Sequence, residues 1–465
     1  MGINFSQRIE QALADSQLRT NFRGAMNFLR NKRQLAFSDE QEWQVLRKQG
    51  AAIRQDVIQR LPELLIQLEQ QCLQNGIQVH WAQDGDQANE IILKIAQNQQ
   101  SKRVIKGKSM ASEEIELNDF LAKHDIECIE SDMGEYIVQL DHEKPSHIIM
   151  PAIHKNTAQI TALFEKKLGI KTPEGDVDAL IGVGRRILRE KFEQADIGIS
   201  GVNFAIADTG TLCLVENEGN GRLSTTAPPV HIALMGLEKV IPNIRVLPTL
   251  QRLLTRSATG QHITTYLNLI SGPRKKDERD GPKEVHLVLL DNGRANIRQD
   301  EKLQNTLACI RCGACMNHCP VYTRIGGHAY GSTYPGPIGQ VVTPQLKGLA
   351  EEGELLDACS LNGACGEACP VEIDLPELIR TLRHRRQESI SKTWSKEALI
   401  WLIWAKIHQH PKLYQQATQL AATLRGLTPY IPSPWRKSRN MPKPAKMSLH
   451  QQVKDRSNIK NRAGN

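Results

Sequence analysis

Seven of the ten cysteines lie between residues 309 and 369, and their spacing carries the clearest chemistry in the sequence. The stretch 309–321 reads CIRCGACMNHCPV. Bacterial ferredoxins use this spacing: a tight loop directs three thiolates at one iron–sulfur cluster, and the fourth cysteine, before proline, binds the other cluster. A zinc ribbon instead uses two well-separated Cys-x2-Cys pairs. The spacing therefore predicts an iron–sulfur site.

A second stretch, 359–371, reads CSLNGACGEACPV and repeats the motif with one difference. It carries Asn362 at the position that corresponds to Cys312. Pairing the two halves with crossed fourth ligands gives a first cluster held by Cys309, Cys312, Cys315 and Cys369, and a second held by Cys319, Cys359 and Cys365.

Asn362 leaves the second cluster without a fourth cysteine, and a neutral amide is a poor ligand for thiophilic iron. Three outcomes follow: a 3Fe–4S cluster, a 4Fe–4S cluster whose fourth iron takes a non-cysteine ligand, or a labile or absent cluster. We favour the first two outcomes, since they give the three remaining cysteines a purpose. Two clusters linked in this way predict electron relay. The segment 326–344 between the motifs is expected to cover the clusters, to dock a partner or to form a plain loop.

The remaining chemistry-bearing residues lie upstream. Lys106 and Lys108 lie in a turn between an apolar run and a predicted helix start. This turn is interpreted either as an anion-binding site or as a plain solvated turn. Arg222 lies in the glycine-dense stretch 207–236, a pattern typical of ligand-binding loops at strand ends. His154 and His231 are as well explained by structural roles as by catalysis.

Several cofactors are not expected. The chain shows neither a Gly-x-Gly-x-x-Gly fingerprint opening a βαβ unit nor a P-loop, so neither NAD nor ATP is predicted. No flavin motif is found either. The three scattered cysteines, Cys72, Cys128 and Cys213, are predicted to be small core residues.

The elements that position these residues follow from hydrophobic periodicity. Residues 1–75 have a helical pattern, and 76–299 alternate short β-rich runs with amphipathic helices, which predicts an α/β domain with a largely parallel sheet. The cysteine module spans 300–390 with helices flanking its loops. A helical region, 391–430, and a basic, disordered tail, 431–465, complete the predicted organisation.

Charge and hydropathy narrow the function classes. The formal net charge is +8, and the tail alone holds nine Lys or Arg residues against one acid. The folded part is therefore balanced, which argues against a nucleic-acid-binding face. The longest apolar run, 398–405, is too short for a membrane span, and no signal-peptide pattern opens the chain. Trp394, Trp401 and Trp404 are expected to pack on the module or a partner, with peripheral membrane contact left open.

Several long stretches carry a family resemblance. VIKGKSMASEEIELN, ESDMGEYIVQL, PSHIIMPAIHKN, ADTGTLCLVENEGNGRLSTTAPPVHIALMG and CIRCGACMNHCPVYTRIGGHAYGSTYPGPIG resemble the iron–sulfur B proteins of the three-protein lactate-utilisation system (the LutB/YkgF family). The resemblance implies an LUD domain over about 75–300, with a Rossmann-like fold similar to isomerases and CoA-transferases. A double-cluster ferredoxin-type module and a family-specific C-terminal region follow it.

The same resemblance implies a function and its setting. The chain would act in the NAD-independent oxidation of L-lactate to pyruvate, in the cytoplasm. Its partners would be a cysteine-rich iron–sulfur subunit and a small LUD protein. Asn362 departs from the full motif and leaves the nature of the second cluster open.

Two hypotheses follow, and they leave open whether this chain is itself an enzyme. In the first, the chain relays electrons taken from lactate at a partner's site. In the second, the LUD domain itself binds and oxidises lactate or another 2-hydroxy acid, with Lys106, Lys108 and Arg222 holding the carboxylate and the clusters as acceptor. Such oxidations usually require a flavin, which favours the relay. A third reading keeps the relay with a different donor.

Overall fold

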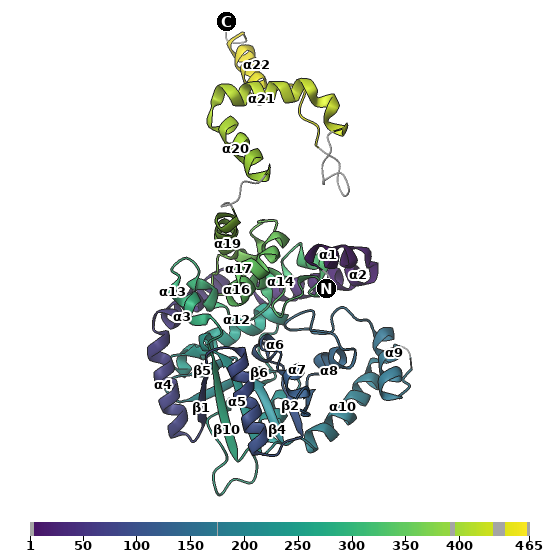
Figure 1. The fold of residues 1–465 in the computed structure, drawn as a ribbon, viewed down its shortest axis with the longest axis vertical. Helices are drawn as coiled ribbons and strands as arrows, with labels where there is room; N and C mark the ends of the chain where they lie inside the picture. The colour runs from purple at the N-terminus through teal and green to yellow at the C-terminus, as the bar shows by residue number, and fades with distance from the viewer. Residues whose placement is uncertain (1–3, 174, 391–395, 431–441, 463–465) are drawn as a thin grey trace. The chain divides into compact units, whose positions relative to one another are not determined.

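The protein, seen here as a computed structural model, consists of two compact units, Met1–Arg386 and Gln387–Asn465 (Figure 1). The structure describes residues 4–173, 175–390, 396–430 and 442–462. The first unit contains the α/β domain together with all ten cysteines.

A six-stranded parallel sheet forms the centre of the first unit, in the order β1-β10-β7-β4-β2-β3. Its strands are β1 (Gln78–Ala82), β2 (Arg103–Lys106), β3 (Glu127–Glu130), β4 (Ile197–Gly201), β7 (Val230–Gly236) and β10 (Glu284–Leu290). Every residue of β7 is buried, as expected for a parallel strand covered on both faces. This confirms the predicted α/β class with a parallel sheet.

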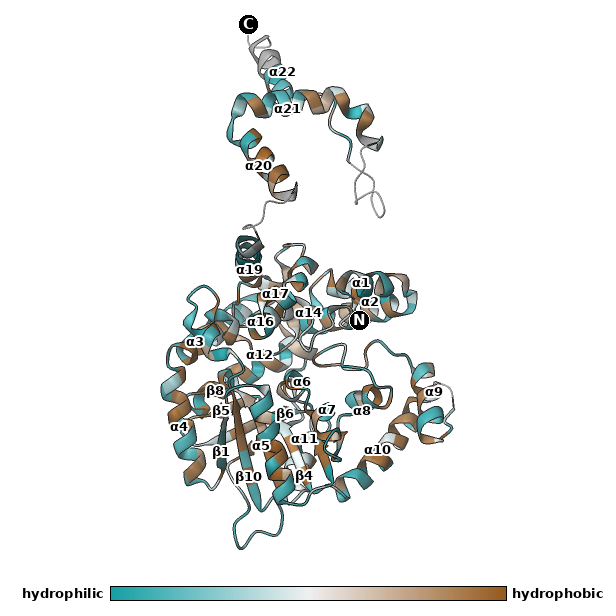
Figure 2. Ribbon diagram, viewed as in Figure 1, coloured by the Kyte–Doolittle hydropathy of each residue, from teal (hydrophilic) through white to brown (hydrophobic). Residues whose placement is uncertain are grey.

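Helices cover both faces of this sheet. Leu287 and Leu289 of β10 pack in the same core as α4 (Leu61–Gln74), whereas Val288 and Leu290 face the core of α5 (Gly85–Asn98). The alternation follows from the two-residue period of a strand. Figure 2 shows the resulting apolar strands between helices with hydrophilic outer faces.

The remaining elements of the α/β domain surround the sheet. The helices are α6 (Met110–Glu114), α7 (Leu117–Ala122), α8 (Met133–Leu140), α9 (Thr157–Leu168), α10 (Val177–Glu193), α11 (Asn220–Thr226), α12 (Leu247–Thr259) and α13 (Arg294–Gln299), with 3-10 turns η1 (Leu237–Lys239) and η2 (Ile244–Val246). A second sheet, in the order β8-β5-β6-β9, contains β5 (Phe204–Ile206), β6 (Thr211–Glu216), β8 (Val240–Ile241) and β9 (Tyr266–Ile270).

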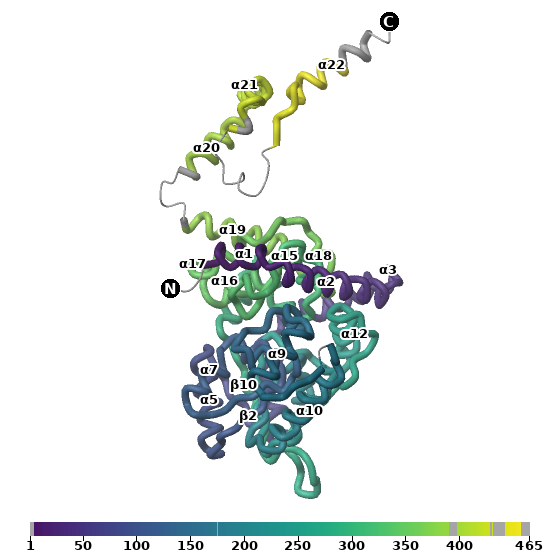
Figure 3. The backbone as a smooth tube through the Cα atoms, turned by 90° about the vertical axis from the view of Figure 1, so that its right-hand side faces the viewer, coloured from purple at the N-terminus to yellow at the C-terminus, as the bar shows by residue number. Residues whose placement is uncertain are grey.

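The N-terminal helices pack on the cysteine module. Figure 3 shows α1 (Phe5–Ala14), α2 (Ser16–Ala36) and α3 (Glu40–Gln59) running along it. Phe22 of α2 packs edge-on against Tyr322, with ring centroids 5.5 Å apart. The region predicted as a separate helical segment therefore shares one hydrophobic core with the cysteine module.

The cysteine module itself is built from short helices. They are η3 (Gln304–Ala308), α14 (Ala314–Asn317), α15 (Tyr322–Ile325), η4 (His328–Tyr330), α16 (Gly336–Lys347), α17 (Leu349–Glu352), η5 (Gly353–Ala358), α18 (Ala364–Glu367) and α19 (Leu375–Ile390). The segment 326–344 is largely buried and includes the start of α16, so it packs as part of the core.

The second unit contains α20 (Lys396–Gln409), α21 (Pro411–Thr423), η6 (Leu424–Tyr430) and α22 (Leu449–Arg462). Trp401 and Trp404 of α20 are exposed within this unit, and Trp394 lies outside the described residues. Among the described helices, none is long and apolar enough to cross a membrane.

The structure differs from the prediction of a disordered tail over its described part. Residues 449–462 form α22, and the side chains of Ser448 and Gln451 each accept a bond from the other's backbone N–H. This capping box satisfies backbone donors at the helix start, a local signal that composition alone does not reveal. Residues 431–441 and 463–465 of the predicted tail lie outside the described residues.

A buried ion network joins the α/β domain to the cysteine module. The Arg294 guanidinium donates to both carboxylate oxygens of Glu114 at 2.8 Å and to Glu238 at 2.6 Å. The neighbouring charge of Arg294 holds the pKa of Glu238 near 2 against the opposing effect of burial. Arg311, inside the first cysteine loop, also pairs with Glu238, and Tyr334 donates to Glu114.

We expect Arg294→Met to destabilise the first unit strongly. The substitution leaves Glu114 and Glu238 buried without their main partner, a change that typically costs about 3–5 kcal/mol. The midpoint of urea unfolding of the full chain measures this. Arg60→Met, which removes two exposed ion pairs, with Asp56 and Glu63, is the control and should leave the midpoint nearly unchanged. Equal midpoints for wild type and Arg294→Met would contradict the expectation.

Candidate functional site

The backbone of the first cysteine loop turns tightly around the cysteine sulfur atoms. Arg311 and Gly313 both have left-handed backbone conformations, with φ of 60° and 76°. These two residues turn the chain tightly between η3 and α14, and the N–H of Arg311 donates to the Cys309 Sγ at 3.4 Å. Such N–H bonds stabilise negative charge on a thiolate ligand.

The second loop repeats this geometry. Leu361 and Gly363 have φ of 53° and 87°, and the N–H of Leu361 donates to the Cys359 Sγ at 3.3 Å. Helix α18 follows as α14 follows in the first loop. The local fold of the motif is therefore preserved even though Asn362 replaces a cysteine.

The structure brings four cysteines from both motifs to one small apolar cavity. Cys309, Cys312, Cys315 and Cys369 line it, together with apolar side chains that include Ile148, Ile338 and Val371. Burial raises the pKa of the Cys312 thiol to about 12, and the nearby charges of Cys369 and Cys309 act in the same direction. This is the group that the crossed pairing predicts for the first cluster.

Cys319, Cys359 and Cys365 form the second group. Burial raises the pKa of the Cys365 thiol to about 12, and the charges of Cys319 and Cys359 add to the shift. Asn362 is exposed, whereas Cys312, at the equivalent position, is buried. The fourth position of the second group is therefore open to solvent or to a partner's side chain.

The cysteine sulfurs lie farther apart than the ligands of a single bound zinc ion. Over the residues that the structure describes, no three cysteine sulfurs lie within 4.8 Å of one another. A tetrahedral zinc with 2.3 Å bonds would hold its sulfurs about 3.8 Å apart. Because burial raises the pKa of the Cys312 and Cys365 thiols, binding of a cluster must release protons from these residues.

Arginines from the N-terminal helices surround the cysteines, and sequence reasoning missed them. Arg47 donates to the carbonyl oxygens of Cys369 and Gly366, both at 2.8 Å, and Arg33 donates to the Ala368 carbonyl at 3.2 Å. Arg54, fully buried, donates to the Ala308 and Leu307 carbonyls. These cations lie where thiolate-ligated clusters would place negative charge. The one available signal was the presence of arginines on otherwise apolar helix faces.

The three predicted anion-binding residues do not converge. Lys106 is fully buried, and its Nζ bonds to Glu130 at 2.7 Å and to Glu113 at 3.0 Å. Arg222 lies exposed on α11. Lys108 lines a cavity of about 190 Å³ at the carboxyl ends of β2 and β4, where its Nζ donates to the Ile149 carbonyl at 2.5 Å.

The two histidines considered in the sequence have different surroundings. His231 is fully buried on β7, with its Nε2 2.8 Å from the Ser200 Oγ, and burial lowers its pKa to about 3. Burial therefore favours the neutral form of His231 inside the sheet. His154 lies beside Glu143 and His328 near the junction with the cysteine module. The scattered Cys72, Cys128 and Cys213 are all buried, which confirms their predicted place in the core.

Comparisons with known families divide the chain into three parts. Residues 65–290 match the LUD domain, residues 305–373 the 4Fe-4S dicluster domain, and residues 382–458 the C-terminal region of lactate utilisation protein B. The dicluster match covers both cysteine loops.

Relatives resemble the chain over nearly its whole length. It is 41% identical over 466 residues to lactate utilization protein B of Bacillus subtilis (97% of this chain, 96% of the relative), and 40% over 470 residues to that of Bacillus velezensis (98% of each). It is 42% identical over 415 residues to the uncharacterized electron transport protein YkgF of Escherichia coli (89% and 86%). A solved DUF162 family protein from Deinococcus radiodurans is 14% identical, with a TM-score of 0.29, over 50% of this chain and 98% of its own.

We expect Asn362→Cys to complete the second cysteine group. The exposed fourth position would gain a thiolate, which holds a fourth iron far better than an amide does. The oxidised protein should then lose any three-iron EPR signal and retain more iron after exposure to air. Ser360→Cys places a cysteine two residues away and is the matched control. An Asn362→Cys protein with the spectrum and iron content of wild type would contradict the expectation.

We expect Arg33→Gln to lower the reduction potential of the first cluster. Burial lowers the pKa of Arg33, and the charges of Cys312 and Cys369 oppose that shift, so the guanidinium lies within electrostatic reach of both. Removing a nearby cation disfavours the added electron. A redox titration followed by EPR measures the potential, with Arg23→Gln on the exposed side of α2 as control. An unchanged or higher potential in Arg33→Gln would count against this role.

Proposed function

Because this chain belongs to the lactate utilization protein B family, we propose that it relays electrons from the NAD-independent oxidation of L-lactate to pyruvate through two iron–sulfur clusters. The observation that carries the proposal is the crossed grouping of the cysteines. Cys369 lies with the first motif's triplet, and Cys319 lies with Cys359 and Cys365. In this arrangement each cysteine loop contributes a ligand to both groups.

The residues around the first group suit electron transfer rather than substrate binding. Cys309, Cys312, Cys315 and Cys369 would supply all four protein ligands of a 4Fe–4S cluster, which would provide reversible one-electron transfer when bound. Ile148, Ile338 and Val371 line the cavity and exclude water from it. The backbone N–H groups and the surrounding arginines compensate negative charge.

The second group gives the relay a more exposed end. Asn362 and the neighbouring Leu361 are exposed, so a 4Fe–4S cluster with a non-cysteine ligand, or its 3Fe–4S form, would meet solvent or a docking protein there. The proposed partners are a cysteine-rich iron–sulfur subunit and a small LUD protein. Electrons would enter or leave where a partner can approach.

A second candidate function rests on the cavity beside Lys108. Ile149 lines this cavity, and its side chain also lies 3.5 Å from a Cβ built on Gly313 in the first cysteine loop. A 2-hydroxy acid bound there would be one loop away from the first cluster. Against this, Asp132, Glu216 and Glu218 share the cavity with Lys108. Their carboxylates disfavour an anionic substrate, so the relay is the better supported function.

An anaerobic EPR titration distinguishes the two functions. We expect dithionite to reduce the clusters of the isolated chain, and L-lactate to reduce them only when both proposed partners are present. Reduction of the isolated chain by L-lactate would overturn the relay and favour catalysis in the LUD domain, with Lys108→Met as the variant to examine. Failure of L-lactate to reduce the clusters even with both partners would overturn lactate as the donor.

A further inference from the structure

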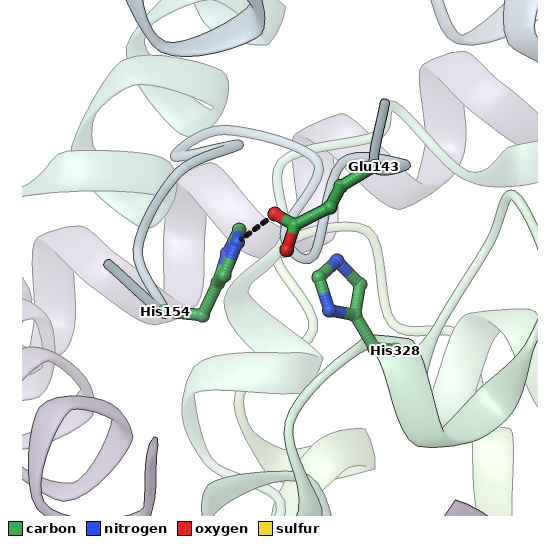
Figure 4. A group of neighbouring side chains, drawn as sticks. All are labelled: Glu143, His154 and His328. Atoms are coloured by element: carbon green, nitrogen blue, oxygen red, sulfur yellow. Dashed lines mark hydrogen bonds and ion pairs between the residues drawn. The ribbon is translucent and has the colours of Figure 1, made fainter. Parts of the chain in front are cut away.

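Three side chains with ligand-type atoms converge at a place that neither cysteine group uses. Glu143 and His154 lie in the segment between α8 and α9, and His328 begins η4 of the cysteine module. One ligand atom from each residue lies within 4.8 Å of those of the other two. Figure 4 shows the Glu143 carboxylate facing both imidazole rings.

The hydrogen bonds of both histidines restrict which ring nitrogen of each can carry a lone pair. When the Ser146 hydroxyl donates to the Pro151 carbonyl, the Nδ1–H of His154 is the donor in its 2.9 Å contact with the Ser146 Oγ. The lone pair of His154 then lies on Nε2, which faces Glu143. His328 donates its Nε2–H to the Lys144 carbonyl at 2.7 Å, which leaves a lone pair on Nδ1. Metal-binding histidines are commonly oriented in this way.

In this tautomer the contact between His154 and Glu143 has room for a positive charge. The His154 Nε2 lies 2.7 Å from a Glu143 carboxylate oxygen, and in this tautomer both atoms are hydrogen-bond acceptors. Either a second proton on His154 or a bound cation satisfies the pair. Lys155 also contacts Glu143 at 2.9 Å, but it bonds to Asp141 as well. Lys155 therefore keeps a carboxylate partner when Glu143 turns to a cation.

The surrounding structure holds these ligands firmly. The Tyr322 hydroxyl donates to the Ser146 carbonyl at 2.7 Å, and a Cβ on Gly327 would lie only 1.8 Å from the same oxygen. Two segments from distant parts of the sequence are therefore in close contact at Ser146 and Gly327. Ser146 lies three residues after Glu143, and Gly327 directly precedes His328. Functional sites depend on such rigid support.

We propose that Glu143, His154 and His328 bind a divalent transition-metal ion, with its remaining coordination positions open to water. Two imidazoles with one carboxylate favour Zn²⁺ or Fe²⁺ over Ca²⁺ or Mg²⁺, which prefer oxygen ligands. Two ligand atoms that are each 2.0–2.1 Å from a tetrahedral ion lie about 3.3 Å apart, so side chains whose ligand atoms now lie within 4.8 Å of one another must move closer together to bind it. The proposal does not depend on the function proposed above.

Access to this site is available through Glu143. Its side chain is 34% exposed and lines a cavity of about 430 Å³ together with His142, Lys144 and Pro145. An ion held by Glu143 would lie at the rim of that cavity. The ion would also tie the α/β domain to the cysteine module, because His328 belongs to the module.

Zinc binding by the full chain with loaded clusters tests the proposal. After dialysis against buffered Zn²⁺, wild type should hold about one zinc per chain, and the double variant His154→Gln, His328→Gln should hold almost none. His142→Gln, at an exposed neighbouring histidine, is the matched control and should bind as wild type does. Ser146→Ala should weaken zinc binding by about 10–100-fold, since it removes the bond that orients His154. Zinc retained equally by wild type and the double variant would be adventitious and would overturn the proposal.

Two further measurements keep the test decisive if the double variant loads its clusters poorly. Zinc-edge X-ray absorption of wild type should show nitrogen and oxygen ligands; sulfur ligands would place the zinc on cysteines and overturn the proposal. Mössbauer spectra of the protein isolated without added zinc show whether the site binds iron or zinc as its native ion. A high-spin Fe²⁺ signal beyond the clusters identifies iron as the native ion, and its absence alongside bound zinc identifies zinc.

Discussion

The buried ion network around Arg294 is the interaction on which the rest of the first unit depends. It connects Glu114 of the α/β domain with Glu238 beside the second sheet, and Arg311 extends it into the first cysteine loop. Buried charges are costly unless each is paired, so the network tolerates little displacement of either part. The cysteine loop is therefore held at the α/β domain by electrostatics as well as by apolar packing.

This constraint makes the cysteine module and the α/β domain one body. Arg54 strengthens the connection, because a single guanidinium from α3 bonds to carbonyl oxygens on both sides, Glu238 and Leu307. The N-terminal helices thereby supply cations to the cysteine loops and cover them with apolar side chains. A ferredoxin-type module on its own would expose the surface of its cysteine loops to solvent. Here that surface is buried in a hydrophobic core that the loops share with the N-terminal helices.

The two cysteine loops show how one motif can serve two purposes. Their backbones share the same left-handed turns and the same N–H bonds to sulfur. They differ in environment, since Cys312 is buried and Asn362 is exposed. The structure therefore has one buried group of four cysteines and one more exposed group of three, as the proposed relay would require.

The sequence by itself determined the chemistry of the cysteine module and the class of the main domain. The Cys-x2-Cys-x2-Cys-x3-Cys-Pro spacing is local, so it could be read directly, and the crossed grouping followed from it. Alternating apolar runs likewise predicted the parallel sheet. The capping box of Ser448 and Gln451 was present in the sequence as Ser-x-x-Gln and was missed, whereas the burial of segment 326–344 has no local pattern.

Only the tertiary structure decided which charged residues meet. Arg33 and Arg47 donate to carbonyl groups that are 335 and 322 residues away in the sequence. Lys106 forms ion pairs with Glu113 and Glu130, so it does not face a ligand site. Glu143 and His154 meet His328 because two loops pack at Ser146 and Gly327. Such meetings depend on how whole elements pack. Side-chain type and spacing along the chain carry no record of contacts between segments that are hundreds of residues apart.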